Sequence, residues 1–274
     1  MEITMMKKRV FVLLLAAVVL FAASAAGALT LPELMQAAQA GMAEAKSYEL
    51  KLTANVSMSA LGESMEMKTI MNIKYLGDPL IMKMTGTVNS TDGKSKIEEY
   101  LRAEDEYMAV YTVEKGGVSK SKYSLSADPL QMVGLPSRNY LDDYKNFKYE
   151  GTAKLGGKTV YVVSAKLNFK EANDQLANQY TGLSSVMGTL KFNGDIDVSV
   201  KMYIDPKTML MVRQEIDMAE MMKEVFRQFG ELVGDTGTDF VDIDIKQYTM
   251  TFDFKNINKV KKFSIPSSVI KKAS

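Results

Sequence analysis

The sequence of 274 residues contains no histidine, no cysteine and no tryptophan. Without histidine and cysteine, neither a Ser-His-Asp nor a Cys-His catalytic set can form, and zinc fingers and histidine-ligated metals are excluded as well. The absence of cysteine also excludes disulfide bonds and a lipid-modified cysteine at the mature N-terminus. We therefore predict that the protein is not an enzyme, holds no metal and needs no cofactor.

The sequence also lacks an excess of either charge, because it contains 34 basic and 33 acidic residues. A dedicated nucleic-acid-binding protein usually carries a strong basic excess, so we predict no nucleic-acid partner. The adjacent carboxylates Glu98 and Glu99 lie on a predicted strand, where they point to opposite faces. They are therefore interpreted as surface charge and not as the paired acids of a glycosidase.

The first 28 residues have the pattern of an export signal. A basic segment at 7–9 precedes an apolar run at 10–21, and the Ala-Gly-Ala sequence at 26–28 fits a cleavage site. The stretch 10–28 is 19 residues long, close to the roughly 20 that span a bilayer, so an uncleaved membrane anchor is the alternative. We predict an exported protein, extracellular or in the cell envelope, whose mature chain begins at residue 29.

Apolar and polar residues alternate along much of the mature chain. Between residues 50 and 60, apolar side chains occupy every even position and polar ones the odd positions. This period of two is typical of strands with one buried and one solvated face. The strands predicted in this way are 50–60, 65–75, 80–88, 95–103, 106–114, 119–125, 147–155, 158–168, 196–204, 210–216 and one long strand or strand pair within 239–256.

A helical period of apolar residues replaces the alternation in three segments. Thr30 and Glu33 form a capping-box pattern with Pro32 in the first turn, which predicts a helix over 31–46. Similar periodicity predicts helices over 169–190 and 218–230. The segment 126–146 breaks the strand pattern and is expected to contain short helical turns.

Three phrases in this order of elements resemble a known superfamily. They are "VYVVSAKLN" before the second long helix, "MYIDPKTMLMVRQEIDM", and the closing "YTMTFDFKN" with "FSIPSSV". Over roughly residues 31–270 the chain resembles the lipoprotein-carrier superfamily of LolA, LolB and the mycobacterial lipid carriers. It is most similar to the methionine-rich exported branch of that superfamily.

The resemblance implies an α+β fold, namely a single antiparallel half-barrel of about eleven strands with helices covering its concave face. The domain would span residues 29–274 and enclose a hydrophobic cavity. The better-known members carry acyl chains or lipoproteins, so a lipid or other apolar ligand is the expected partner, whereas the sequence leaves a protein partner open. The chain departs from LolB in lacking the anchoring cysteine, and no residue matches a functional position of LolA.

Methionine is unusually frequent on the predicted inner face. Its unbranched, polarizable side chain adapts to irregular apolar surfaces, whereas Val, Ile and Leu specify a rigid core better. The predicted cavity wall consists of Met58, Met65, Met67, Met71, Met82 and Met84. The predicted helical lid consists of Leu34, Met35, Met218, Met221, Met222, Val225, Phe226 and Phe229.

Two other interpretations remain open at this point. The methionines could instead fill a solid core, which would make the protein a non-enzymatic extracytoplasmic sensor or an envelope interaction module. The basic "NKVKKF" and "VIKKAS" segments near the C-terminus are compatible with contact at an anionic membrane surface, although a solvated chain end is the more common role.

Overall fold

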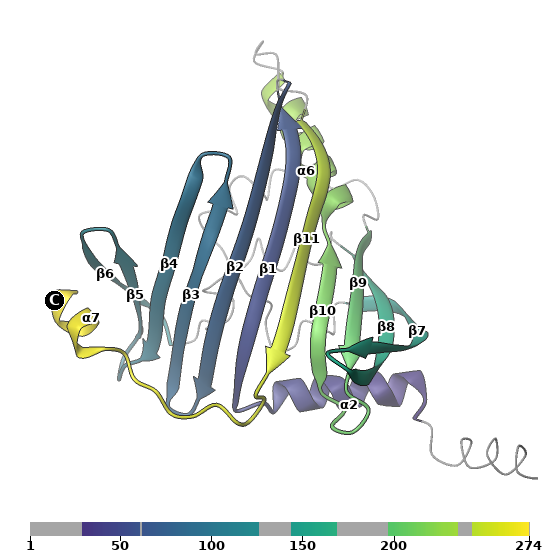
Figure 1. The fold of residues 1–274 in the computed structure, drawn as a ribbon, viewed down its shortest axis with the longest axis horizontal. Coiled ribbons are helices and arrows are strands. Elements are labelled where there is room, and N and C mark those ends of the chain that lie inside the picture. Colours follow the sequence, from purple (N-terminus) through teal and green to yellow (C-terminus); the bar gives the residue numbers. More distant parts are fainter. Residues whose placement is uncertain (1–28, 61, 126–143, 169–196, 235–242, 274) are drawn as a thin grey trace, which may run out of the picture.

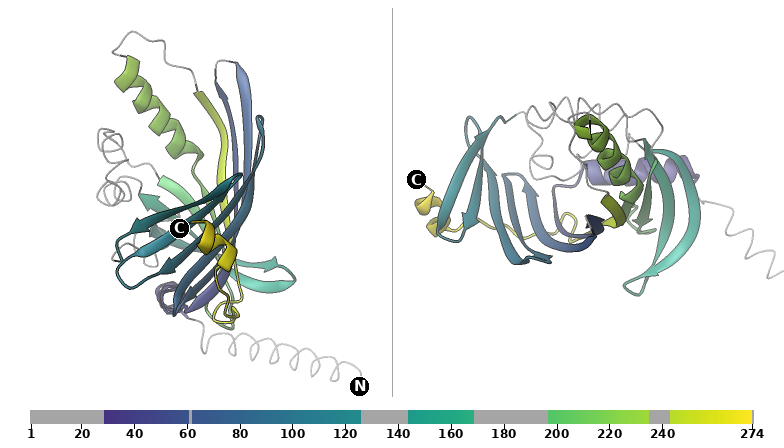
Figure 2. Two further views of the ribbon diagram at one scale, coloured as in Figure 1. Left: turned by 90° about the vertical axis from the view of Figure 1, so that its left-hand side faces the viewer. Right: turned by 90° about the horizontal axis from the view of Figure 1, so that it is seen from above.

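A computed structural model describes residues 29–60, 62–125, 144–168, 197–234 and 243–273. Its strands form one eleven-stranded sheet in the order β6-β5-β4-β3-β2-β1-β11-β10-β9-β8-β7. Neighbouring strands are antiparallel throughout, and β6 and β7 are the two edges, so the sheet does not close. It curls instead into an open half-barrel (Figures 1 and 2). The predicted α+β half-barrel of about eleven strands is therefore confirmed.

The elements follow one another in a simple chain order. They are α2 (Leu31–Ala43), β1 (Ser47–Ala60), β2 (Glu63–Gly77), β3 (Leu80–Ser90), β4 (Gly93–Ala103), β5 (Met108–Glu114), β6 (Gly117–Tyr123), β7 (Tyr144–Leu155), β8 (Lys158–Asn168), β9 (Asp197–Ile204), β10 (Met211–Asp217), α6 (Ala219–Gly234), β11 (Ile243–Lys255) and α7 (Ser267–Lys272).

Most predicted boundaries lie within four residues of the observed ones. The first helix ends at Ala43, three residues early, because the chain must turn before β1 begins at Ser47. The last strand region is one long strand, β11, within the described residues. Strand β7 starts three residues earlier than predicted, and α7 was not predicted at all. The predicted helix over 169–190 lies outside the described residues, as do residues 126–143 of the segment 126–146 in which helical turns were predicted. Residues 144–146 of that segment belong to β7.

The central strands place the alternating apolar residues on the concave face. Leu50 of β1 is paired with Ile73 of β2 and with Phe254 of β11, and the next inward residue, Leu52, is paired with Met71 and Phe252. These rows of side chains extend across the sheet because each strand has the same period of two. The result is a mostly apolar surface on the inner side of the half-barrel, with the buried Gln214 of β10 in the same row as Phe252.

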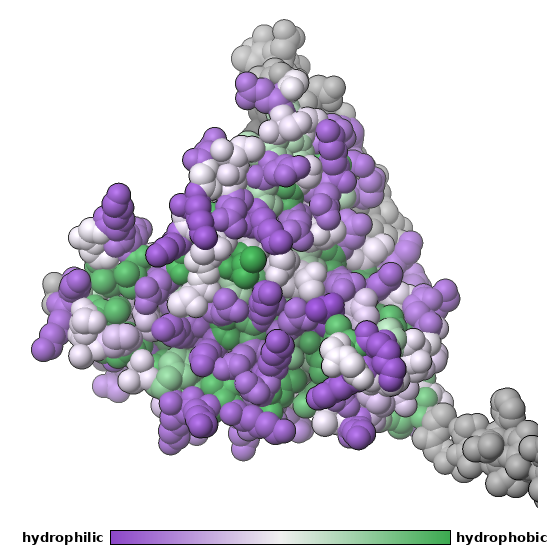
Figure 3. Space-filling model, viewed as in Figure 1, coloured by the Kyte–Doolittle hydropathy of each residue, from purple (hydrophilic) through white to green (hydrophobic). Residues whose placement is uncertain are grey.

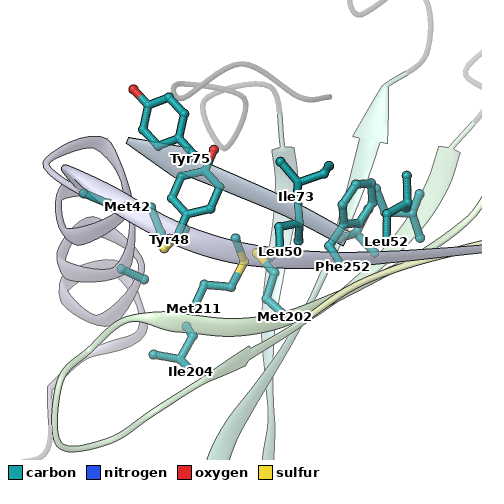
Figure 4. Close-up of a cluster of buried hydrophobic side chains, with 14 of the residues drawn as sticks. Met42, Tyr48, Leu50, Leu52, Ile73, Tyr75, Met202, Ile204, Met211 and Phe252 are labelled. Atoms are coloured by element: carbon teal, nitrogen blue, oxygen red, sulfur yellow. The ribbon is translucent and has the colours of Figure 1, made fainter. Parts of the chain in front are cut away.

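The lower end of the concave face is a closely packed core, which Figure 4 shows in close-up. The rings of Tyr48 and Tyr75 stack at 4.9 Å between centroids. Met202 of β9 and Met211 of β10 are fully buried beside them. We call this buried cluster the lower core, and it comprises Leu34, Met35, Ala38, Met42, Tyr48, Leu50, Ile73, Tyr75, Met82, Met84, Leu101, Met202, Ile204 and Met211.

Helix α2 closes the lower core from below. The Thr30 side chain caps the helix, and the Glu33 carboxylate accepts a hydrogen bond from the Thr30 N–H at 2.7 Å, so the predicted capping box is formed. A Cβ atom at Gly41 would lie 2.8 Å from Leu210 Cδ2, so glycine at this position lets the helix approach the β9–β10 turn closely. The sequence pattern thus determined both the start of the helix and the face that it buries.

Helix α6 is attached to the sheet at its N-terminal end. The Met218 N–H donates to the Tyr248 carbonyl of β11 at 2.8 Å, and the Asp217 carboxylate accepts from the Ala219 N–H at 3.1 Å. From this point the helix lies along the concave side of β11 and then leans away from the upper strand ends (Figure 2). Its tether is therefore at mid-sheet, while its far end stands off the strands.

A glycine inside β3 allows this strand to lie very close to β2. Gly86 is paired with Met71 of β2, and a Cβ atom there would lie only 2.3 Å from the Ile70 carbonyl oxygen. No other residue type fits this position without displacing the neighbouring strand, which is why a glycine within a strand often marks a sharp bend. Here it allows β2 and β3 to coil tightly as the half-barrel curls.

The outer, convex face carries a second apolar cluster that the sequence pattern did not reveal. After β11 the chain crosses the outside of the sheet along its lower edge and ends in α7, which lies against β5 and β6 (Figures 1 and 2). Ile265 and Val269 from this segment are buried. They pack on Leu76, Ile81, Tyr100, Ala109 and Tyr111, all from the outer face. Helix α7 thus covers the convex face, whereas α2 and α6 lie on the concave one.

Candidate ligand-binding surface

The upper part of the concave face is lined with methionines that are not fully buried. Met58 of β1 is paired directly with Met65 of β2, and the neighbouring inward row pairs Val56 with Met67. Met65 is 47% exposed, and Met58, Met67 and Met71 are partly buried. On the inner side of a curved sheet, these side chains form an apolar surface that the described residues cover only in part.

A fifth methionine on this surface was missed by the sequence analysis. Met250 of β11 is paired with Ala54 of β1 and with Ile216 of β10, so it lies on the same face and is partly buried. The alternation of β11 contained the signal, because even-numbered residues 248 to 254 are aromatic or apolar. We call Met58, Met65, Met67, Met71 and Met250 the upper methionine cluster.

Helix α6 presents its apolar stripe toward the sheet beside this cluster. Met221 is buried, and Met218, Met222 and Val225 are partly buried and pack against the inner-face side chains. Phe226 is also half-buried, while the Phe229 side chain lies outside the described part of the structure. On the opposite side of the helix, Glu220 pairs with Lys223 at 2.7 Å, and Glu224 pairs with Arg227. The helix is therefore amphipathic in space as well as in sequence.

The remaining predicted wall and lid residues belong to the lower core. Met82 is 0% exposed and Met84 is 2% exposed, and both pack beside Tyr75 and Ile73. Leu34 and Met35 of α2 are buried in the same cluster. The structure thus divides the predicted site into an accessible upper part and a buried lower part. The alternation of apolar and polar residues did not predict this division, because it indicates the face of a side chain and not its burial.

Charged networks lie on the outer face. Arg213 of β10 pairs with Asp253 of β11 at 2.6 Å, and the Tyr203 hydroxyl donates to Glu215 at 2.9 Å. Burial and this hydrogen bond raise the pKa of Tyr203 to about 12. These groups tie strands β9 to β11 together and lie on the side of the sheet opposite the upper methionine cluster.

The most strongly perturbed carboxylate is Glu104, in the turn between β4 and β5. Hydrogen bonds from Tyr107, Arg102, Tyr111 and Lys120 lower the pKa of Glu104 to about 2, against a smaller opposing effect of burial. The Arg102 and Lys120 nitrogens lie 2.7 and 3.2 Å from its oxygens. Every one of these partners holds the carboxylate in its ionised form, so the cluster is suited to stability and not to proton transfer.

Two grooves formed by described residues lie away from the upper methionine cluster, whereas a third, of about 460 Å³, is lined by residues of β9 to β11 that include Met250 of that cluster. One, of about 730 Å³, opens where β4 and β5 separate and is lined by Ile97, Glu99 and Thr112. Another, of about 560 Å³, lies among the β7–β8 turn, the β9–β10 turn and the end of β11. Within the described ranges, no group of acidic side chains could hold a metal ion, and no helix has the length and apolarity of a membrane span.

A family model that covers residues 30–274 matches the chain, and its family is DUF6612, a family of unknown function. The chain therefore belongs to this family. It matches none of the curated proteins.

Solved structures with a similar arrangement come from several bacteria. The lipoprotein LppX of Mycobacterium tuberculosis is 11% identical, with 86% of this chain and 100% of that chain covered and a TM-score of 0.46. LprF from Mycobacterium bovis is 12% identical over 85% and 95% of the two chains, with a TM-score of 0.43. A LolA superfamily protein from Nitrosomonas europaea is 7% identical over 88% and 97%, with a TM-score of 0.28.

Proposed function

We propose that the protein is an exported carrier that holds an acyl chain or another apolar ligand between the upper methionine cluster and helix α6. The observation that carries this proposal is the incomplete covering of the inner face beside α6, where Met65 is 47% exposed next to the partly buried Met58. Apolar side chains exposed together on a concave surface are typical of ligand-binding or interaction sites. The ligand would bury them.

The chemistry of methionine supports a ligand of variable shape. Thioether side chains lose little by changing rotamer, so they can pack against each other when the site is empty and rearrange around an acyl chain when it is filled. The predicted wall residues Met82 and Met84 would then form the buried floor of the site. The described inner surface of β1 and β2 presents no charged side chain between Tyr75 and Met65, which suits an uncharged chain.

The role proposed for the N-terminal segment follows from its sequence. Residues 1–28 would direct export and be removed, or remain as an anchor, and residues 29–274 would form the carrier domain. Contact with a membrane surface is part of this proposal, because an apolar ligand must enter and leave at a bilayer or another apolar surface. The protein would act as a binding protein and not as an enzyme.

Displacement of a dansyl-labelled fatty acid tests the proposal, together with mass spectrometry of lipids that co-purify with the protein. We expect the wild-type chain to bind the probe, and Met67→Glu and Met222→Glu to weaken binding at least tenfold, because a carboxylate beside the acyl chain loses hydration on binding. Asn72→Glu is the matched control, since it adds the same charge to the outer face of the same strand, where Asn72 is exposed.

The alternative function is a non-enzymatic sensor or envelope interaction module with a filled interior. The close packing of the lower core favours this alternative for the lower part of the concave face, since Met82, Met84 and Met202 are fully or almost fully buried. This alternative predicts that no lipid co-purifies and that the wild-type protein leaves the fatty-acid probe free at every concentration tested. Either result would count against a carrier.

A further inference from the structure

The chain is nearly neutral overall, but its basic and acidic residues are distributed unequally along the sequence. The mature sequence from residue 29 contains 31 basic and 32 acidic side chains. Six of the basic residues and none of the acidic ones lie in 255–274, so residues 29–254 contain 25 basic and 32 acidic side chains. A body with a net charge of −7 therefore carries a C-terminal segment with a charge of +6.

The described part of this segment, residues 255–273, is ordered against the sheet, and we call it the lysine strap. The Asn258 N–H donates to the Ser47 carbonyl at 2.7 Å, and the Asn258 side chain accepts from the Lys46 N–H at 2.7 Å. The Asn256 amide donates to Glu49 at 2.7 Å. Asn256 and Asn258 both have a positive φ, a conformation that asparagine tolerates better than most residues. The strap is thus held by specific turns.

The apolar residues of the strap point toward the sheet and its lysines point outward. Ile265 and Val269 are buried, and Val260, Phe263 and Ile270 pack around the same outer-face cluster. The six lysines are all exposed, and they are Lys255, Lys259, Lys261, Lys262, Lys271 and Lys272. This division contradicts the interpretation of a freely solvated chain end, because such an end would not bury Ile265 and Val269 against the sheet.

The strap lies along one edge of the molecule. In Figure 1 it runs beneath the lower ends of the strands toward α7, and α2 lies along the same lower edge. Hydrophilic side chains gather along this edge in the space-filling view of the same face (Figure 3). The chain enters the fold at α2, directly after the apolar stretch at 10–28. The basic strap and the entry point of the N-terminal segment are therefore on the same side.

We propose that the lysine strap docks the protein on an anionic phospholipid bilayer, with the lower edge toward the membrane. Exposed lysines near an anionic leaflet each contribute a favourable interaction, and a rigid row of them presents these contributions together. The body, with its net negative charge, is repelled from the same surface, so the charge separation also orients the molecule. This inference shares the exported location with the proposed function but does not depend on the apolar ligand.

Co-sedimentation with vesicles tests the proposal on the chain from residue 29 onward. We expect binding to vesicles of phosphatidylcholine with phosphatidylglycerol, little binding to phosphatidylcholine alone, and loss of binding at high salt. Replacing Lys259, Lys261 and Lys262 by glutamine should weaken the partition coefficient roughly fivefold per lysine, about 100-fold together. Circular dichroism melting checks that this variant folds.

The matched control removes three lysines from the other end of the same face. Lys68, Lys94 and Lys96 are exposed on the upper, outer parts of β2 and β4. Their replacement by glutamine changes the net charge equally and should leave vesicle binding within twofold of the wild type. Equal loss in both variants would overturn the proposal, as would binding to phosphatidylcholine alone or retention of binding in the strap variant. Binding to soluble polyphosphate without binding to the anionic vesicles would also overturn it, in favour of a polyanion partner.

Discussion

The two ends of the concave face use the same residue type for different purposes. In the lower core, methionines such as Met82 and Met202 are fully buried between strands and α2. In the upper methionine cluster, Met58 and Met65 form a cross-strand pair that α6 and the neighbouring strands leave partly uncovered. Sequence pattern is identical in the two regions, so the difference arises from what packs against each.

The difference in covering follows from where the helices are attached. Helix α2 is tied at its start by the capping box and lies close to the β9–β10 turn, so it seals the lower end. Helix α6 is tied to mid-sheet through Met218 and Tyr248, and it then diverges from the upper strands (Figure 2). A helix held at one end can change its distance from the sheet with little loss of contact, whereas a helix sealed into a core cannot.

The largest effect is expected from a matched pair of charge insertions. Met82→Glu should lower the free energy of unfolding by about 4 kcal/mol or more, because the carboxylate would be buried without a partner. Met67→Glu should cost about 1 kcal/mol, because the partly exposed side chain can reach water. Urea unfolding followed by circular dichroism measures both. Similar losses in the two variants would mean that the upper cluster is as solid as the lower core.

Truncation of one methionine in each region should give a smaller difference in stability of the same sign. Met82→Ala should lower the free energy of unfolding by about 2–5 kcal/mol, since it removes fully buried atoms and leaves a cavity. Met65→Ala should change it by about 0.5 kcal/mol or less, since nearly half of that side chain is already exposed. Urea unfolding measures both variants, and equal destabilisation by Met65→Ala and Met82→Ala would contradict the predicted difference between the two regions.

Acid titration is expected to give the smallest effect and to separate stability from ligand binding. The folded-state pKa of Glu104 lies near 2, below its ordinary value of 4.5, so its carboxylate stabilises the fold above about pH 4.5. This contribution is lost as the pH falls through about 2. Glu104→Gln should therefore lower the free energy of unfolding at neutral pH by about 1 kcal/mol and flatten its acid dependence.

The control measurement for the titration is ligand affinity. Glu104 lies on the outer face with Arg102 and Lys120, so Glu104→Gln should leave fatty-acid binding unchanged at pH 7. A nuclear magnetic resonance titration would report its pKa in the wild-type protein directly. An ordinary value near 4.5 would show that the outer-face cluster does not stabilise the carboxylate.

Local sequence signals predicted the elements of the fold well. Alternation in β1, β2 and β3 identified strands that the structure pairs in register, and Thr30 and Glu33 identified the start of α2. These signals work because side-chain direction in a strand and capping at a helix end depend on neighbouring residues alone. Helix α7 was missed because its six residues are too few to show a period.

The candidate site was predicted only in part, because accessibility depends on distant partners. Met67 and Met84 occupy equivalent alternating positions in sequence, yet Met84 is almost fully buried and Met67 is partly exposed. Met250 was overlooked because its place next to Ala54 results from pairing between strands almost 200 residues apart. A local sequence pattern could not predict the location of the lysine strap on the outer face either.

The sequence by itself determined the class of fold, the inward set of apolar residues, the absence of histidine and cysteine chemistry, and the accumulation of lysine near the C-terminus. The tertiary structure decided which methionines are buried in the lower core and which stay partly exposed, and it ordered the C-terminal segment as the lysine strap. The physical reason is that the direction of a side chain depends on its own strand, whereas its burial depends on every segment that packs over it.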